Sequence, residues 1–211
     1  WNMGTFFDSR EDGGEYEGWK KSDGWNDEKY RQRVKKTVMY MASNLRDADL
    51  IILEEVESRD VLVSLLEEGL KREGYLYYGI SSDEKDMSVA FISRIKPASV
   101  SFLFTPSSRA MINLTFLIEG EEICVIGVHL RSRIKEENDS VRMEELSLLR
   151  DEAEKCDVPL IILGDFNSDP IIHSHEMGRN YSAILPLTGD GSVSYGGTLF
   201  SPYIDYASPL E

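Results

Sequence analysis

The sequence predicts an α/β fold in which mixed β-sheets are covered by helices. Three observations support this prediction. Two short apolar runs, typical of buried strands, each end in acidic residues; segments with helical spacing alternate with strands in the N-terminal part; and closely spaced strands fill the middle of the chain. Closely spaced strands form hairpins, whereas helices between strands pack on a sheet, so the order is typical of mixed sheets covered by helices. A chain of 211 residues suits one domain, residues 1–211.

The first elements are a strand, a loop and a helix. Trp1–Phe7 is predicted to be the end of the first strand, and Asp8–Gly24 to be an acidic, glycine-rich loop. Asn26 is a good helix N-cap, and the helix is predicted to run to about Arg46. Its apolar face is formed by residues at helical spacing: Tyr30, Val34, Val38, Met41 and Leu45.

A second strand and helix follow. Asp49–Val56 is predicted to be a strand, and Ser58 can cap a helix that ends at Gly74. The apolar residues of that helix recur on one side: Val61, Leu62, Leu65, Leu66 and Leu70.

The rest of the predicted elements are mostly strands. Glu119-Gly120-Glu121 predicts a hairpin turn, Arg131–Asp139 a charged loop, and Ser140 the start of a third helix. Pro159 precedes a last strand. The closely spaced strands are predicted at Tyr75–Gly79, Val89–Ser93, Ala98–Thr105, Ala110–Ile118 and Glu122–Leu130.

The two apolar runs that end in acid indicate a candidate site. Leu160–Leu163 is followed by Gly164, and then Asp165 and Asn167 can point the same way because strand side chains alternate between faces. Leu50–Leu53 is likewise followed by Glu54 and Glu55. Two strands that end in carboxylates suit a hard divalent cation. The alternatives are solvated acids at strand ends and Asx turn chemistry.

Five short motifs in order along nearly the whole chain resemble the endonuclease/exonuclease/phosphatase superfamily, which includes pancreatic-type deoxyribonucleases and sphingomyelinases. The W-N block of that family is matched by Trp1-Asn2, and D-I-I-x-L-Q-E-V, A-I-L-S-R, H-L and G-D-F-N are matched by Asp49–Val56, Ala90–Arg94, His129-Leu130 and Gly164–Asn167. The resemblance implies a four-layer sandwich of two stacked mixed sheets flanked by helices. The start of the chain also resembles a secreted bacterial branch of the family.

The resemblance assigns roles to particular residues. It implies that Glu55 is the metal-binding carboxylate and that Asn2 assists in binding the metal and the phosphate. The implied cofactor is Mg²⁺, Mn²⁺ or Ca²⁺. Asp165 matches the residue that positions the attacking water, while Asn167 and His129 match residues that hold phosphate oxygens. Glu54 stands where the family has glutamine, and Arg109, Arg131 and Arg133 are candidate phosphate clamps. A core histidine and solvated arginines are the alternative interpretations.

One part of the family pattern is absent from the sequence. The final S-D-H block, whose histidine is the general base, does not occur. Asp205 resembles the aspartate that orients this base, although Pro209 follows it closely; His173 and His175 are expected in a loop. We expect that the domain is clipped at both ends and lacks its C-terminal strand, which would supply the Asp-His pair.

Composition limits the class of function. The net charge of −15 disfavours a general polyanion-binding surface, although bound cations can invert the local potential. No apolar run is long enough to span a membrane, and the two cysteines predict no disulfide framework. We expect a monomeric metal-dependent phosphodiesterase, and in particular a nuclease that acts on nucleic acid. A phosphatase or lipid phosphodiesterase of the same fold and a non-catalytic binding module are the alternatives.

Overall fold

The computed structural model describes residues 1–12, 14–82, 87–105, 109–132, 138–167, 172–174 and 179–181. The chain divides into two compact units. The first unit contains Trp1–Phe104, Arg109–His129 and Val158–Asp165, and the remaining segments form the second.

The first sheet of the first unit has the strand order β1-β2-β4-β3. Strand β1 is parallel to β2, whereas β4 is antiparallel to both β2 and β3, so the sheet is mixed. The bounds of these strands are Asn2–Phe6 (β1), Leu50–Val56 (β2), Tyr77–Ile80 (β3) and Ser88–Ser93 (β4).

The second sheet has the order β5-β6-β7-β8 and is also mixed, because only the β7–β8 pair is parallel. Its strands are Ser99–Phe104 (β5), Ala110–Ile118 (β6), Glu121–His129 (β7) and Leu160–Asp165 (β8). The predicted pair of mixed sheets is therefore confirmed.

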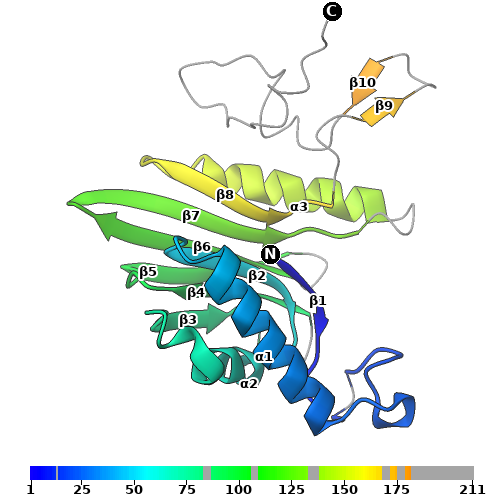
Figure 1. The fold of residues 1–211 in the computed structure, drawn as a ribbon. Coiled ribbons are helices and arrows are strands. Elements are labelled where there is room, and N and C mark those ends of the chain that lie inside the picture. Colours follow the sequence, from blue (N-terminus) through cyan, green and yellow to red (C-terminus); the bar gives the residue numbers. More distant parts are fainter. Residues whose placement is uncertain are drawn as a thin grey trace, which may run out of the picture. The chain divides into compact units, whose positions relative to one another are not determined.

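Two helices cover one face of the first sheet (Figure 1). Helix α1 (Asp27–Asn44) begins as predicted at Asn26, whose side chain accepts hydrogen bonds from the amides of Glu28 and Lys29 at 3.1 Å. Helix α2 (Arg59–Leu65) continues into a π-helical turn, η2 (Leu66–Leu70).

Side chains alternate along β2, so the two faces of the first sheet pack against different layers of the first unit. Ile51 and Leu53 pack in the core beneath α1 and α2, whereas Ile52 packs in the core between the sheets. Ile112 and Leu114 of β6 complete that second core from the other side. The layers are therefore helices, first sheet and second sheet, as the α/β prediction requires.

The second unit contains α3 (Asn138–Ala153) and a two-stranded ladder of β9 (Ile172–Ser174) and β10 (Arg179–Tyr181). Helix α3 begins two residues before the predicted Ser140. A short 3₁₀ helix, η1 (Lys21–Asp23), lies in the predicted loop that follows β1.

The start of one predicted strand was wrong by two residues for a physical reason. The strand expected at Tyr75–Gly79 begins at Tyr77, because Tyr75 stays attached to the preceding helix. Its amide donates to Leu70 O at 3.1 Å, and its buried hydroxyl donates to Ala48 O at 2.7 Å. Among the described residues, no helix has the length and apolar character needed to cross a membrane.

Candidate functional site

Four polar side chains from four strands meet at one end of the two sheets of the first unit. Asn2 opens β1, Glu55 lies near the end of β2, and His129 and Asp165 end β7 and β8, where they are direct register partners. The Asn2 amide nitrogen donates to Glu55 Oε1 at 3.1 Å and to Asp165 Oδ2 at 3.3 Å. His129 Nε2 lies 3.8 Å from Glu55 Oε1. The sequence predicted all four residues, and the structure brings them together.

A wide bulge in β1 orients the Glu55 carboxylate. Asn2 is paired with Glu54 and Phe6 with Val56, so residues 3–5 lie opposite the single residue Glu55. Gly4, Thr5 and Glu55 all have left-handed backbone, with φ of 63°, 55° and 61°. The turned Thr5 amide donates to Glu55 Oε2 at 2.7 Å, and the Gly4 amide donates to Asn2 Oδ1 at 2.8 Å. The bulge thus holds both side chains by backbone N–H groups.

Gly164 allows β8 to place Asp165 beside the other residues. Its φ is 138°, which side chains rarely adopt, and a Cβ built on it would lie 1.9 Å from the carbonyl oxygen of Val128 on β7. Only glycine fits this close approach of two backbones.

His129 is buried and neutral at pH 7. Only 4% of the residue is exposed, and burial, with a smaller contribution from the positive charge of Arg109, lowers its pKa to about 4. The charges of Glu55 and Asp165 act in the opposite direction but are outweighed. Arg109 also donates to the backbone oxygen of His129 at 3.4 Å. A neutral imidazole next to two carboxylates can act as a hydrogen-bond donor.

Glu54 is the most buried acid at this end of the sheet. It is 1% exposed, and burial raises its pKa despite the Trp1 α-amino group at 3.0 Å. A cavity of about 500 Å³ opens beside it, with Asn2, Glu54 and Asp165 as polar lining and Leu45, Leu50 and Leu163 among the apolar lining. The departure from the family's glutamine therefore places an additional acid beside the candidate metal ligands.

The donor set fits a hard divalent cation. Oxygens of Glu55 and Asp165, which come from different sheets, converge on the single nitrogen of Asn2. Magnesium and calcium ions prefer carboxylate and amide oxygens, and two carboxylates that converge on one point are an arrangement of this kind.

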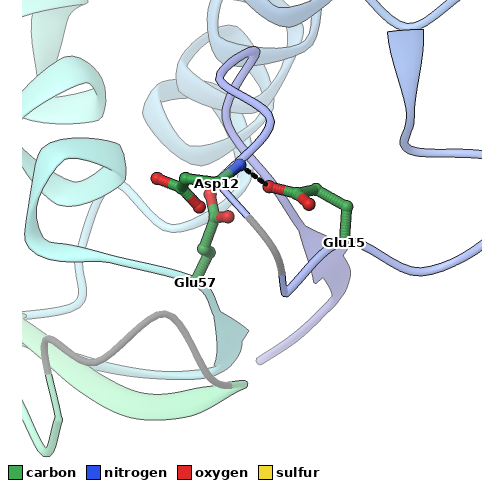
Figure 2. A group of neighbouring side chains, drawn as sticks. All are labelled: Asp12, Glu15 and Glu57. Carbon is green, nitrogen blue, oxygen red and sulfur yellow. Dashed lines mark hydrogen bonds between the residues drawn. The ribbon is translucent and has the colours of Figure 1, made fainter.

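A second group of acids lies in the loop after β1 and beside the end of β2. Carboxylate oxygens of Asp12, Glu15 and Glu57 lie within 4.8 Å of one another (Figure 2). Glu57 is 2% exposed, and burial raises its pKa to about 7, with smaller contributions from the charges of Asp8, Asp12 and Glu15.

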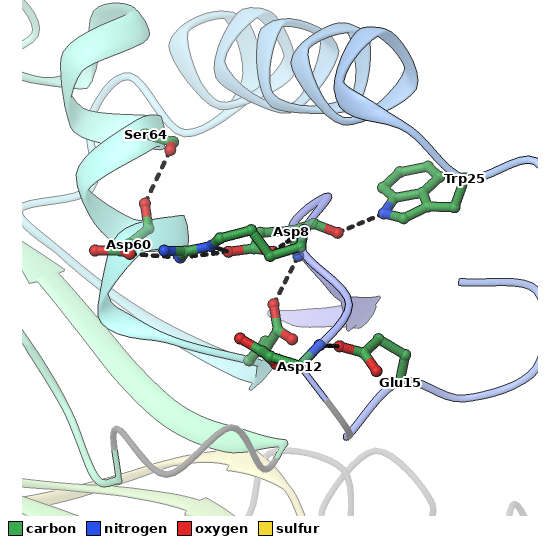
Figure 3. Close-up of polar contacts among 8 residues, drawn as sticks. Asp8, Asp12, Glu15, Trp25, Asp60 and Ser64 are labelled. Atoms are coloured by element: carbon green, nitrogen blue, oxygen red, sulfur yellow. Dashed lines mark hydrogen bonds and ion pairs between the residues drawn. The ribbon is translucent and has the colours of Figure 1, made fainter. Parts of the chain in front are cut away.

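These acids hold the loop through backbone hydrogen bonds. The Asp8 amide donates to Glu57 Oε2 at 2.7 Å, and the Asp12 amide donates to Glu15 Oε1 at 2.6 Å. Asp8 is also bound by Arg10, which bridges it to Asp60 on α2, and its carbonyl accepts from the indole of Trp25 (Figure 3). The cluster thus binds the backbone of the loop at Asp8 and at Asp12.

The other predicted residues belong to the second unit or fall outside the described residues. Asn167 belongs to the second unit, where its side-chain amide donates to Leu130 O at 2.8 Å. Arg131 also belongs to that unit, and its amide donates to Glu145 at 2.7 Å. The backbone of His173 lies in β9, but its side chain is outside the described residues, as are Arg133, His175 and Asp205.

Three groups that take part in the site, in the β1 bulge or in the second group of acids were not predicted from the sequence. The Thr5 amide had no signal, because backbone conformation and not side-chain type makes it a donor. Arg33 follows Tyr30 by three residues and so interrupts the apolar face of α1. A charged residue on that face is a signal that could have identified it. Glu57 continues the acidic end of β2, but its burial depends on the folded loop.

A protein-family model matches nearly the whole chain. The family model described as Endonuclease/Exonuclease/phosphatase family matches residues 1–207. No curated protein sequence matches the chain significantly.

The chain has the fold of several solved structures at low sequence identity. TDP2 from D. rerio, complexed with a single-strand DNA product, is 18% identical with a TM-score of 0.54, covering 68% of this chain and 55% of that one. Sphingomyelinase C from Streptomyces griseocarneus is 14% identical with a TM-score of 0.57, covering 74% and 62%. Beta toxin from Staphylococcus aureus is 16% identical with a TM-score of 0.55, covering 74% and 63%.

The chain therefore spans a little over half of the length of these structures. The family match extends from the first site residue, Asn2, to beyond Asp165, and so includes all four residues of the site. The chain belongs to the endonuclease/exonuclease/phosphatase family.

Proposed function

We propose that the protein is a metal-dependent phosphodiesterase that cleaves nucleic acid by in-line attack of water on phosphorus. The observation that carries the proposal is the convergence of Glu55 and Asp165 on Asn2, with His129 beside them. Family membership supports phosphoester hydrolysis as the class of reaction.

The metal would be held by the carboxylate of Glu55, with Asn2 and Asp165 nearby, and Mg²⁺ or Mn²⁺ is the expected ion. When bound, such an ion polarises a phosphate and neutralises charge on the leaving oxygen. Asn2 donates to both carboxylates and so holds their oxygens near one another, where they would be available as ligands.

The protein's own groups supply the remaining tasks. Asp165 would orient the attacking water, since it ends β8 beside Asn2. Neutral His129 would donate from Nε2 to a phosphate oxygen, and the family resemblance assigns the same task to the side-chain amide of Asn167. Such fixed donors stabilise charge that develops in the transition state.

The net charge of −15 favours a second candidate, a phosphatase or lipid phosphodiesterase, because a chain so acidic attracts a polyanion only where cations invert the local field. The likeness to a TDP2 structure with a DNA product supports nucleic acid, and the likeness to sphingomyelinase C supports a lipid substrate. We place nucleic acid first on the likeness to the TDP2 structure that holds a single-strand DNA product.

The test compares plasmid nicking with hydrolysis of bis(4-nitrophenyl) phosphate by the full-length protein, with and without EDTA. Asp165→Ala and His129→Ala should each lower kcat about 10²-fold or more, the scale for a lost transition-state donor or positioned charge. Exposed Asp157, changed to alanine, is the matched control and should leave kcat unchanged. Hydrolysis that survives EDTA would exclude the metal mechanism, and hydrolysis of only the small diester would favour a lipid phosphodiesterase. Mn²⁺ binding without hydrolysis would indicate a binding module.

A further inference from the structure

Arg33 of α1 is clamped against the bulge of β1. Its guanidinium carbon lies 4.3 Å from the ring centroid of Phe6 and 4.3 Å from that of Trp19. It donates from Nη2 to Met3 O and Gly4 O at 2.8 Å, and from Nη1 to Thr5 O at 3.0 Å. One side chain therefore binds three consecutive carbonyl groups and stacks on two aromatic rings.

These three carbonyls are the ones that the bulge removes from the sheet. Gly4 and Thr5 are left-handed, so this part of β1 cannot pair regularly with β2. Gly4 O also accepts from Thr5 Oγ1 at 2.7 Å, and Thr5 O also accepts from the Phe7 amide at 3.0 Å. Arg33 adds a charged donor to each of the three oxygens and joins them through one rigid group, and so stabilises the left-handed turn.

The opposite side of the same turn faces the candidate site. The Thr5 amide donates to Glu55 Oε2 at 2.7 Å, and the Gly4 amide donates to the Asn2 side chain at 2.8 Å. The Met3–Gly4 and Gly4–Thr5 peptide groups therefore each bind Arg33 through the carbonyl oxygen and a residue of the site through the N–H group.

We propose that Arg33 is a positioning residue of the site: it fixes the left-handed turn of β1 so that the Thr5 and Gly4 amides hold the Glu55 carboxylate and the Asn2 amide in place. The inference deepens the proposed function and rests on it for the role of Glu55 in binding a metal. The planar fork of arginine is required, because three carbonyls and two ring faces cannot be satisfied by a lysine ammonium.

The charge of Arg33 has a separate, long-range effect. Burial lowers its pKa to about 10, with the negative charge of Glu55 acting in the opposite direction, so it is protonated at pH 7. Arg33→Lys keeps a positive charge near Glu55 but loses the fork. This variant distinguishes positioning from simple attraction between the charges.

The experiment measures two properties of the full-length protein: amide hydrogen exchange at Thr5 by NMR without metal, and Mn²⁺ affinity by isothermal titration. Arg33→Met and Arg33→Lys are compared with Arg31→Met, an exposed arginine on the same helix. Val38→Ala, in the core beneath α1, is a control for general loss of stability.

Arg33→Met should accelerate Thr5 exchange about tenfold or more relative to the amides of β4, and should weaken Mn²⁺ binding by about 10- to 100-fold, the scale for residues that orient metal ligands. Arg33→Lys should show most of both losses. Arg31→Met should change neither, and Val38→Ala should accelerate exchange without selecting Thr5.

Wild-type exchange at Thr5 in Arg33→Met would overturn the proposal, and so would equal Mn²⁺ losses in Val38→Ala. Retention of both properties by Arg33→Lys would show that charge alone acts and would also overturn it. If the wild-type protein binds no Mn²⁺, the proposed function fails, and Thr5 exchange alone decides whether Arg33 positions the turn.

Discussion

The backbone amide of Thr5 donates to Glu55 Oε2 at 2.7 Å, and both residues have left-handed backbone. Left-handed conformation costs roughly 1–2 kcal/mol for a residue with a side chain, so the contact is made at the expense of local stability. Such outliers persist where the surrounding structure determines them, and here hydrogen bonds from Arg33 and to Glu55 do so. Strained backbone at the candidate metal ligand is consistent with a site that is organised before it binds.

Thr5→Gly should stabilise the protein by about 0.5–1 kcal/mol, because glycine adopts φ of 55° without the clash of a β-branched side chain. The amide that binds Glu55 is retained. Urea unfolding would measure the change. In the regular strand β6, Thr115→Gly should instead lower the free energy of unfolding by a similar amount. Equal destabilisation by the two variants would contradict the left-handed geometry at Thr5.

Asn2→Asp should destabilise the metal-free protein by about 1–3 kcal/mol at pH 8, because a third carboxylate replaces the donor shared by Glu55 and Asp165. Asn2→Ala loses the same two donated hydrogen bonds without adding charge, and it also loses the acceptor of the Gly4 amide, which aspartate keeps. The pH dependence of the difference between the variants therefore isolates the effect of the charge. The difference between the two variants should shrink as the pH falls, since protonation removes the repulsion. Urea unfolding in EDTA at several pH values would measure it. If the two variants are equally stable at pH 8, the carboxylates do not converge as described.

Gly164→Ala should cost roughly 3 kcal/mol or more, since its Cβ would meet the Val128 carbonyl at 1.9 Å. Gly120→Ala is a useful comparison: its φ is also positive, 93°, but nothing lies within 4 Å of an added Cβ. Only the conformational cost, about 1 kcal/mol, is expected there. Thermal unfolding of both variants separates the steric from the conformational term. A Gly164→Ala protein as stable as Gly120→Ala would show that β7 and β8 are not so close.

The sequence predicted the strand ends well, for a simple reason. The apolar run Leu50–Leu53 becomes the largely buried strand β2, whereas Leu160–Leu163 becomes β8 with Ile161 and Leu163 exposed. In both cases the acid that follows the run lies where the strand ends. Glu55 and Asp165 were found in this way. Asn2 and His129 required the ordered motifs, because an isolated asparagine or histidine carries little information.

Backbone conformation and long-range packing were not predictable in the same way. No residue pattern marks the left-handed turn at Thr5, since threonine normally favours extended strands. The role of Arg33 depends on contacts with β1 and with Trp19, which are distant in sequence. The burial of Glu57 likewise depends on the folded loop that contains Asp12 and Glu15. These features arise from tertiary contacts and not from local propensity.

The most direct test of the account is isothermal titration of the full-length protein with Mn²⁺ at pH 7, beside Glu55→Gln and Glu57→Gln. Glu55→Gln keeps the size of the side chain but removes the charged ligand, so Mn²⁺ affinity should fall at least about 10- to 100-fold. Glu57→Gln alters the second group of acids and should bind Mn²⁺ as the wild type does. Equal affinity in the wild type and Glu55→Gln, with loss only in Glu57→Gln, would contradict the assignment and place the ion at the loop acids.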